Sequence, residues 1–438
     1  MSLFSAKSLL RQVFASFGIK FANVALSLLL AVLLARVLGV SGYGDYAFVY
    51  AIVMMLAIPS QMGLPQLVVR ETARADRNQD WAAMRTIWRW AHLFVILSSF
   101  GTMTVVLIWV VLRVQETGIR NAFIFGLLLI PLIALGNVRG AALSGLGKVV
   151  LGQLPENVLR PLCLFAGLSS AAYLVAQGQM TAAGALGLHV GAAGFAFLVG
   201  SVLLSQNRPR YVALAEASPP QTRAWLMAAG AFGLLAGLQT INSTLDIVMI
   251  GIMRSREEVG IYKIAVTAAG LTVLGLQVIN IVIMPRIAHL HAGRELKAMQ
   301  ALVTTTARLI LLAAGLASLV LIVFGKVLIG YAFGADFVAG YPALVVLTLG
   351  QLANAAFGSV GLLLNMSGHE RFSLVGVAIA CVANVCLNLV LIPLFGILGA
   401  ATATAVTLVI WNVVLYWQVW QKLGIDSAAI RLMKTRAL

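Results

Sequence analysis

Long apolar runs separated by short polar breaks are the feature that most restricts how this chain folds. A helix needs about 20 predominantly apolar residues to cross the hydrocarbon core of a bilayer, and the 438 residues have room for about twelve such runs. Only 10% of the residues are charged, against roughly 25% in soluble domains. The sequence therefore predicts an all-α polytopic membrane protein. The expected spans are 13–36, 45–68, 89–112, 122–146, 154–176, 181–205, 224–250, 259–283, 306–330, 340–365, 372–395 and 398–420.

The distribution of Lys and Arg between the loops predicts the orientation. Of the 30 such residues, 21 fall on one side of the expected helices, and Lys20 and Arg160 lie within spans. Because cytoplasmic loops carry an excess of Lys and Arg, both termini are expected in the cytoplasm. The net charge of +16 does not indicate nucleic-acid binding, because the cations form no single patch. The seven residues on the opposite side are Arg36, Arg113, Arg120, Arg254, Arg256, Lys263 and Lys326.

A weak internal repeat divides the chain into two halves. Three short Gly and Pro patterns recur in the same order at offsets of 216 to 221 residues. Each half then holds six spans, and an even number of spans keeps both halves in the same orientation. Parallel repeats of this kind build transporters with a site between two lobes. The matching pairs are Gly44 with Gly260, Pro65 with Pro285, and Gly147 with Gly368.

The repeat and the polar breaks predict four regions. An N-terminal six-helix lobe covers residues 1–205, and a C-terminal six-helix lobe covers residues 224–421. Residues 206–223, with three prolines, are expected to form a cytoplasmic linker between the lobes. Residues 422–438 are expected to form a basic cytoplasmic tail. The N-terminus shows no small-residue cleavage site, so the first apolar run is expected to be retained as a span.

Several motifs resemble the polysaccharide transporter family, the O-antigen-type flippases of oligosaccharide lipids. The most specific is Leu391–Ala401, which is similar to the family's "LIP-x-x-G-x-x-GAA" turn between the last two helices. The remaining motifs lie in the first lobe, and together they extend the resemblance over the whole chain. They are Leu34–Gly39 with Gly42–Tyr46, Gly63–Gln66, and Arg139–Ala141 with Gly145–Lys148.

The resemblance implies a fold and a function. The fold would be two six-helix bundles forming a V around a central cavity, in the superfamily that also contains multidrug and toxin extruders. The cargo would be a polyprenyl-diphosphate-linked oligosaccharide, moved from the cytoplasmic to the outer leaflet of the bacterial inner membrane by alternating access. Such a flippase would serve cell-surface polysaccharide synthesis, with polysaccharide polymerase machinery as a partner.

Three cations inside the first lobe are the candidate substrate ligands. Ionisable side chains in a membrane span are costly and face a cavity or a partner. Lys20, Arg139 and Arg160 all lie within about 10 Å of the cytoplasmic boundary at 1.5 Å rise per residue. A planar guanidinium donates two hydrogen bonds to phosphate oxygens, so these residues are predicted to bind the diphosphate. The alternative is that their long side chains reach out to the headgroups.

Five further residues are candidates for a gate or for ion coupling. Glu156 precedes Arg160 by four residues, which predicts a helical ion pair, either structural or part of an ion-responsive switch. Asp246 and Lys263 lie at similar depths near the outer side, so they form either a static pair or a gate or coupling-ion site. Arg36 and Asp45 occupy the corresponding outer hairpin of the first lobe, where pairing across the lobes would hold the outer side shut.

The motif search disfavours other function classes. The sequence has no phosphate-cradling Gly-Lys-Ser/Thr loop, no Cys/His metal cluster and no nucleophile elbow, so no cofactor, metal or catalytic residue is expected. An ion-coupled multidrug exporter is the alternative function. It should have an acidic cavity, whereas the spans carry more cations than acids. A membrane glycosyltransferase is disfavoured by the short outer loops. The coupling ion, proton or sodium, stays open.

Overall fold

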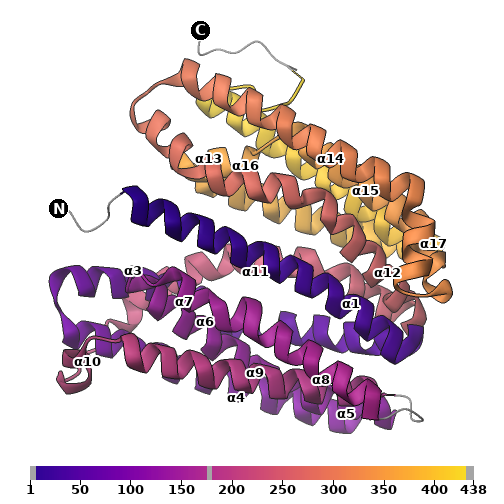
Figure 1. The fold of residues 1–438 in the computed structure, drawn as a ribbon, viewed down its shortest axis with the longest axis horizontal. Coiled ribbons are helices and arrows are strands. Elements are labelled where there is room, and N and C mark those ends of the chain that lie inside the picture. The colour runs from indigo at the N-terminus through magenta and orange to yellow at the C-terminus, as the bar shows by residue number, and fades with distance from the viewer. Residues whose placement is uncertain (1–5, 175–179, 431–438) are drawn as a thin grey trace. The chain divides into compact units, whose positions relative to one another are not determined.

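The structure is a computed structural model that describes residues 6–174 and 180–430, and the elements within these ranges are all helical (Figure 1). Contacts divide the chain into two compact units, Met1–Thr240 and Ile241–Leu438, and the division falls inside α11, C-terminal to the predicted linker. The N-terminal unit contains α1 (Ala6–Leu56), α2 (Ile58–Gln61), α3 (Leu64–Asn78), α4 (Trp81–Arg113), α5 (Thr117–Leu127), α6 (Leu129–Gly145), α7 (Val149–Leu154), the π-helical turn η1 (Pro155–Leu159), α8 (Arg160–Leu174), α9 (Ala182–Asn207), α10 (Arg210–Leu214) and the first part of α11 (Thr222–Met253).

The C-terminal unit repeats the all-helical plan. It contains the end of α11, α12 (Arg256–Ala269), the short 3₁₀ turn η2 (Gly270–Val273), α13 (Leu274–Ala292), α14 (Leu296–Ala332), η3 (Ala335–Gly340), α15 (Tyr341–Phe357), α16 (Val360–Met366) and α17 (Glu370–Leu423). Among the described residues, nine helical stretches are long and apolar enough to cross a membrane. Two of them contain sharp breaks, at Gly39 and Gly396. Dividing these two stretches at their glycines gives eleven segments, and the helical segment Val149–Leu174 is the twelfth. The twelve segments match the twelve predicted spans, so the prediction of a polytopic all-α protein is confirmed.

Glycine makes the two sharp breaks possible. Gly39 has φ 67° and ψ −176°, and Gly396 has φ 57° and ψ −134°. These angles lie in a region that only glycine adopts without steric cost. In Figure 1 the indigo α1 runs away from the N-terminus and the chain then returns toward α3. Both glycines belong to motifs of the family resemblance, which therefore mark the turns between paired helices.

Two helix ends support the internal repeat directly. α6 and α16 each end two residues before a glycine in the left-handed region: Gly147 has φ 74° and Gly368 has φ 75°. In the first, the amide of Lys148 donates to the carbonyl of Leu143 at 2.9 Å. In the second, His369 donates to Leu364, also at 2.9 Å. Each residue of the second motif lies 221 positions after its counterpart, so both halves end this helix with the same capping motif.

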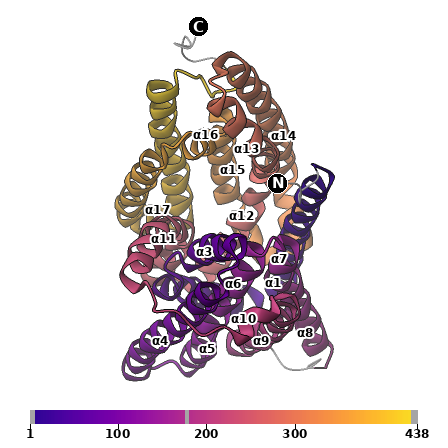
Figure 2. The same cartoon turned by 90° about the vertical axis from the view of Figure 1, so that its left-hand side faces the viewer.

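The N-terminal unit is built around α6, which packs against α3, α7 and α9 (Figure 2). The first part of α11 joins this unit by close backbone contact. A Cβ on Gly63 would lie 2.5 Å from the carbonyl of Ala229 and from the amide of Gly233. The chain that leads into α11 is tied to α4, because Arg85 donates to the carbonyls of Ala213, at 2.9 Å, and Ala215. The linker is therefore held by its backbone.

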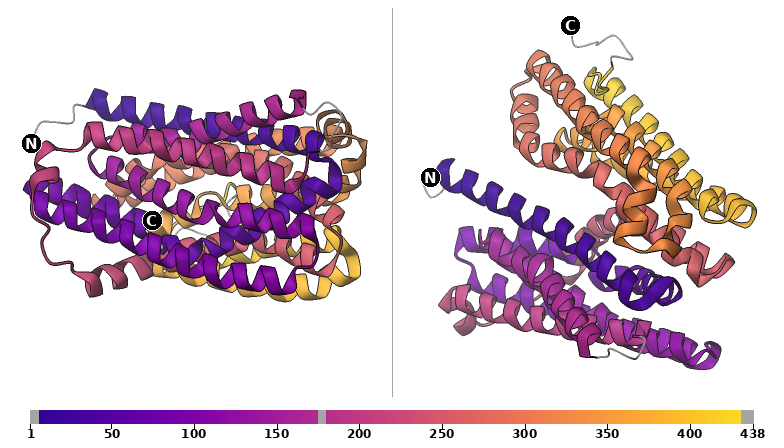
Figure 3. Two further views of the ribbon diagram at one scale, coloured as in Figure 1. Left: turned by 90° about the horizontal axis from the view of Figure 1, so that it is seen from below. Right: turned by 45° about the vertical axis from the view of Figure 1, so that its right-hand side comes forward.

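The C-terminal unit, coloured from red-orange to yellow in Figure 3, is centred on α15, which packs against α14 and α17. Within the predicted basic tail, residues 422–438, the segment Ile425–Ala429 is buried in this unit; the cytoplasmic location of the tail stays a prediction. Gln300 accounts for this burial: its amide donates to the carbonyl of Asp426 at 2.7 Å and accepts from the amide of Asp426 at 2.9 Å. Ala429 also donates to the carbonyl of Ala356 at 2.9 Å. Residues 431–438 lie outside the described residues.

Candidate functional site

The predicted ion pair of the first lobe forms on a distorted helix. Glu156 Oε2 lies 3.1 Å from Arg160 Nη1, with 12% and 19% of the two side chains exposed. The residues between them form the π-helical turn η1, which follows Pro155 and precedes Pro161. A proline inside a helix lacks the N–H that the carbonyl four residues earlier would accept. The expected ion pair is therefore confirmed, and it lies where the helix is locally widened.

A side chain of α1 donates a hydrogen bond to a backbone carbonyl of this turn. Asn23 Nδ2 donates to the carbonyl of Asn157 at 2.8 Å, four residues before Pro161. This bond joins α1 to the π-helical turn, three residues after Lys20 and three residues before Arg160. Lys20 is exposed. Two of the three predicted diphosphate ligands therefore lie on helices that touch each other and are at least partly accessible.

Arg139 differs from the other two cations, because it is only 4% exposed. Its Nη1 donates to the carbonyl of Phe197 and, at 2.6 Å, to Ser201 Oγ on α9. Its guanidinium carbon lies 3.2 Å from the centroid of the Phe197 ring, within the range of a cation–π interaction. Its Nη2 is buried without a hydrogen-bond partner in the described part of the chain. In this structure Arg139 contacts the unit's own interior, and its role toward a diphosphate stays a prediction.

Glu156 and Arg139 share one small pocket. They line a cavity of about 10 Å³ together with Gly136 and Gly140, which is room for about one water molecule. A Cβ on Gly136 would overlap the carboxylate of Glu156. Glycine at this position therefore lets the acid approach α6, and the carboxylate can balance the charge of both arginines.

Tyrosine and histidine side chains extend this polar group toward α9. The hydroxyl of Tyr46 lies 2.9 Å from His189 Nδ1, and both residues are 6% exposed. The His189 ring also stacks on Tyr50, with centroids 5.2 Å apart. Arg160 interacts electrostatically with Tyr46 and His189. We call Tyr46, Arg139, Glu156, Arg160 and His189 the N-terminal polar cluster; it contains two arginines and one acid.

The C-terminal unit holds a buried carboxylate of a different kind. Asp246, 7% exposed, accepts hydrogen bonds from Tyr262 at 2.9 Å, from Asn388 at 2.6 Å, and from Thr404. Asn388 also donates to Asn384 at 2.9 Å, and its own Oδ1 is buried without a partner in the described residues. We call these five residues the Asp246 site. Its donors are all neutral, and it presents a carboxylate with several neutral oxygen atoms.

The static pair of Asp246 with Lys263 does not form. No Lys, Arg or His of the described ranges makes an ion pair with Asp246. The residue of α12 that bonds to its carboxylate is Tyr262. The role of Lys263 in gating or coupling is not tested by this geometry. In the first lobe, Arg36 is exposed and Asp45 is half-buried, and their predicted role at an outer gate also stays a prediction.

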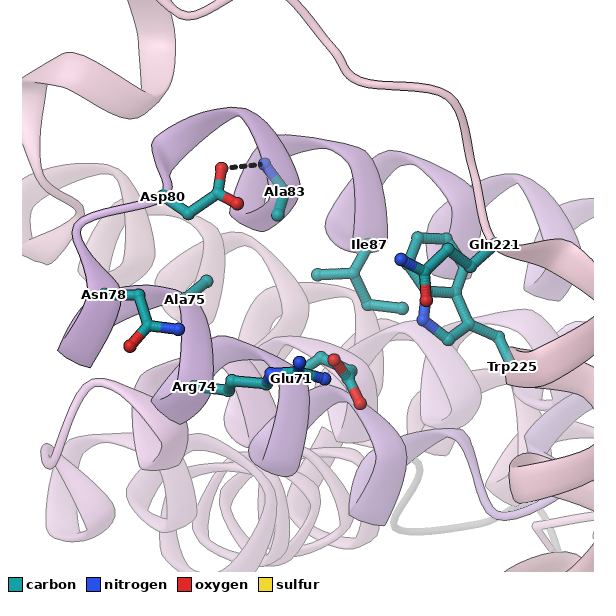
Figure 4. Close-up of a pocket in the computed structure, with 9 residues that line it drawn as sticks. All are labelled: Glu71, Arg74, Ala75, Asn78, Asp80, Ala83, Ile87, Gln221 and Trp225. Atoms are coloured by element: carbon teal, nitrogen blue, oxygen red, sulfur yellow. Dashed lines mark hydrogen bonds between the residues drawn. The ribbon is translucent and has the colours of Figure 1, made fainter.

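A polar pocket opens at the start of α4, but its charge does not suit an anion. It has a volume of about 150 Å³ and lies between α3, α4 and the start of α11. Figure 4 shows Glu71 and Arg74 on one side, Asp80 with its bond to the Ala83 amide on another, and Gln221 beside Trp225. Two carboxylates against one guanidinium make this pocket a poor diphosphate site.

Sequence reasoning found the charged residues but missed most of their partners. Asn384 and Asn388 are amides in an apolar stretch of the sequence, and His189 is a histidine in another. Nothing in the sequence indicated that Tyr262 and Thr404 complete the Asp246 site. The clearest available signal was the repeat itself, which aligns Tyr46 with Tyr262. The described residues contain no group of three or more His, Cys, Asp or Glu side chains that would hold a metal ion.

Comparison with known proteins decides the family. The family model for polysaccharide biosynthesis proteins matches residues 9–291. The chain belongs to this family. The resemblance carried by the sequence motifs is thereby confirmed. The match covers the N-terminal polar cluster and Asp246.

Similar proteins agree with this assignment. The chain is 23% identical over 385 residues to the "probable low-salt glycan biosynthesis flippase Agl15" of Haloferax volcanii, covering 87% of this chain and 77% of that protein. Its fold is similar to a multidrug resistance MATE family transporter of the MOP superfamily (TM-score 0.75, 13% identity, 94% and 98% of the two chains covered). It is also similar to the lipid II flippase MurJ (TM-score 0.69, 14% identity, 93% and 86% covered). These comparisons identify a transporter rather than an enzyme.

Proposed function

We propose that this protein is a flippase that moves a polyprenyl-diphosphate-linked oligosaccharide from the cytoplasmic to the outer leaflet of a bacterial inner membrane. The observation that carries the proposal is membership of the polysaccharide biosynthesis family in a chain whose N-terminal unit holds an excess of cations inside its spans. The name of its relative in Haloferax volcanii, a probable glycan biosynthesis flippase, supports the same function. On this proposal both termini face the cytoplasm and the product feeds polysaccharide polymerase machinery.

The cations of the N-terminal unit would hold the diphosphate. Lys20 is exposed on α1, and Arg160 is partly exposed on the neighbouring α8. Arg160 is already paired with Glu156, so a diphosphate would compete with that carboxylate for the guanidinium. Arg139 lies behind the same acid and balances its charge when Arg160 turns to the ligand. A buried anionic headgroup needs such charge-assisted hydrogen bonds, because its transfer into a low-dielectric interior is otherwise very costly.

The Asp246 site would couple transport to a monovalent cation, proton or sodium. A carboxylate that is buried among neutral donors gains a favourable partner when a proton or Na⁺ arrives, because a buried charge is stable only when paired. Binding of the ion would therefore favour one state of an alternating-access cycle. Lys263, Arg36 and Asp45 would act at the outer gate.

Transport in purified vesicles tests the proposal. Protein reconstituted in proteoliposomes should expose labelled lipid-linked oligosaccharide from the lumenal leaflet to an added glycosidase within minutes, whereas empty liposomes should protect half of the label. Replacing Arg160 by Gln should slow this exposure, while replacing Arg113, at the far end of α4, should not. Equal rates with and without protein would reject the flippase function.

Multidrug export is the second candidate function, and the Asp246 site favours it because an acidic site can couple or bind cations. The two functions differ in cargo charge. Expression in a drug-sensitive host should leave the resistance to cationic drugs unchanged if the protein is a flippase. Increased resistance that is lost in Asp246→Asn would favour the exporter.

A further inference from the structure

A second polar cavity lies in the C-terminal unit, apart from the Asp246 site. It has a volume of about 200 Å³ and is formed where α13, the break between α15 and α16, and the end of α17 meet. The described lining contains no ionisable side chain. We call it the amide pocket; its polar side chains are Asn280, Asn354, Ser359, Trp411 and Asn412.

A break in the helical backbone borders this cavity. Gly358, with φ 71° and ψ −150°, ends α15, and α16 begins at Val360. Gly358, Ser359 and Val360 all line the pocket. Irregular backbone at membrane depth is tolerated only where it is buried in protein or lines a cavity. In transporters, such interrupted helices are where substrate groups bind.

The amides of the pocket are only partly used by the protein. Asn280 Oδ1 accepts from Ser359, but its Nδ2 has no partner among the described residues. Asn412 Nδ2 donates to Asn354 at 2.9 Å and to the carbonyl of Leu408 at 2.8 Å, which leaves its Oδ1 without a donor. Trp411 Nε1 is likewise buried without an acceptor in the described chain. Two unused donors and one unused acceptor therefore border one cavity.

The chemistry of these groups selects the ligand. A neutral lining offers no compensation for a phosphate charge, so the diphosphate is excluded. Amide donors and acceptors beside an indole suit a neutral ring that carries hydroxyl groups and apolar C–H faces, because each hydroxyl both donates and accepts. The volume is below the roughly 300–1,000 Å³ of pockets for drug-sized ligands. It therefore suits one sugar ring and not a whole oligosaccharide.

We propose that the amide pocket binds one neutral sugar ring of the lipid-linked glycan. The proposal rests on the proposed flippase function and adds to it a separate subsite for the glycan. The charged and the neutral parts of the cargo are then recognised by different units of the chain. The diphosphate is held by cations of the N-terminal unit, and the sugar is held by amides of the C-terminal unit.

Binding measured with two lipids tests this division. The probes are the lipid-linked glycan purified from the cells that make this protein, and the bare polyprenyl diphosphate. The wild-type protein in detergent should bind the glycan lipid more tightly than the bare lipid. Asn412→Leu and Trp411→Phe should each reduce that preference about three- to tenfold, which corresponds to one or two lost hydrogen bonds. Their affinity for the bare lipid should not change.

Matched variants separate a lost subsite from a damaged protein. Asn365→Leu, an exposed amide on the neighbouring α16, and Trp417→Phe, an exposed indole on α17, should keep the wild-type preference. Gly361→Leu should remove the preference by filling the cavity while leaving the amides in place, since a Cβ at Gly361 meets its nearest neighbour, in Leu415, only at 3.8 Å.

Other outcomes of the binding experiment would contradict the proposal. Equal wild-type affinity for both lipids, or an unchanged preference in the pocket variants, would overturn the sugar subsite and leave the flippase function standing. Pocket variants that weaken both lipids equally would assign the cavity to the prenyl chain and also overturn it. A wild-type protein that binds neither lipid would reject the proposed function itself.

Discussion

The two halves of this chain place equivalent tyrosines in opposite electrostatic surroundings. Tyr46 and Tyr262 occupy matching positions of the repeat, and both are buried. Tyr46 bonds to the His189 ring beside two arginines and one acid, whereas Tyr262 donates to the carboxylate of Asp246. The two halves therefore share an arrangement of helices but differ in the charged residues around these tyrosines. We infer from this difference that the halves handle different ligands, an anion in the first and a cation in the second.

The largest effect is expected from the acid of the N-terminal polar cluster. Glu156→Gln removes the only carboxylate that the structure shows beside Arg139 and Arg160. An uncompensated buried charge typically costs about 3–5 kcal/mol, so the free energy of unfolding should fall by about 3 kcal/mol. Thermal unfolding in detergent measures this change.

The matched control for Glu156 is Glu71, whose pair with Arg70 lies at the surface. The Arg70 side chain is 51% exposed, and exposed pairs contribute about 0–1 kcal/mol. Glu71→Gln should therefore shift the unfolding temperature little. If both variants lost the same stability, the N-terminal polar cluster would not be a buried charge system, and the contrast with the Asp246 site would weaken.

The second largest effect concerns the carboxylate of the other half. Asp246→Asn keeps the shape of the side chain but removes the charge that would bind a coupling ion. Transport in proteoliposomes should fall on the order of tenfold, equivalent to about 1.4 kcal/mol, and its dependence on sodium or proton gradients should disappear. Asp336→Asn, an exposed acid in η3 of the same unit, is the control. Full ion-dependent transport by the Asp246 variant would remove the coupling role.

The tyrosine pair tests the comparison itself. Hydrogen bonds to charged groups contribute about 1.5–3 kcal/mol, and bonds between neutral groups about 0.5–1.5 kcal/mol. Tyr262→Phe should therefore lower the unfolding free energy more than Tyr46→Phe does, by about 1 kcal/mol. Both changes remove one hydroxyl at equivalent places, so each variant controls the other. A larger loss from Tyr46→Phe would mean that the charges of the two halves are not arranged as described.

How much of the structure the sequence predicts depends on how far apart the interacting residues lie along the chain. The spans were predictable because each depends on one continuous apolar run. The Glu156–Arg160 pair was predictable because its residues are four apart on one helix. Asp246 was recognised as important, but Thr404 and Asn388 lie 158 and 142 residues away from it. Only tertiary packing brings them together, so the sequence favoured the nearer Lys263 as a partner, which the structure does not pair with it.

For two segments, the sequence predicted the general character but not the local structure. The Glu156–Arg160 pair was predicted to be helical, and in the structure it lies between Pro155 and Pro161 on a π-helical turn that Asn23 completes from another helix. The C-terminal tail was expected to be cytoplasmic because it is basic. That prediction did not include the burial of Ile425–Ala429 in the C-terminal unit, which arises because Gln300 bonds to both backbone groups of Asp426. Composition cannot reveal a backbone pairing of this kind.

The smallest effect is expected where the halves are alike. Gly147→Ala and Gly368→Ala each place a Cβ in the left-handed region, which costs roughly 1–2 kcal/mol per residue. Because the two capping motifs share their angles and their hydrogen bonds, both variants should lose about 1 kcal/mol of unfolding free energy, measured by thermal unfolding. Gly191→Ala, on α9 with nothing within 4 Å of its Cβ, should be neutral or slightly stabilising. Unequal losses of unfolding free energy at Gly147 and Gly368 would show that the two halves differ in their backbone structure as well as in their charges. The comparison of the two tyrosines would then no longer report on electrostatics alone.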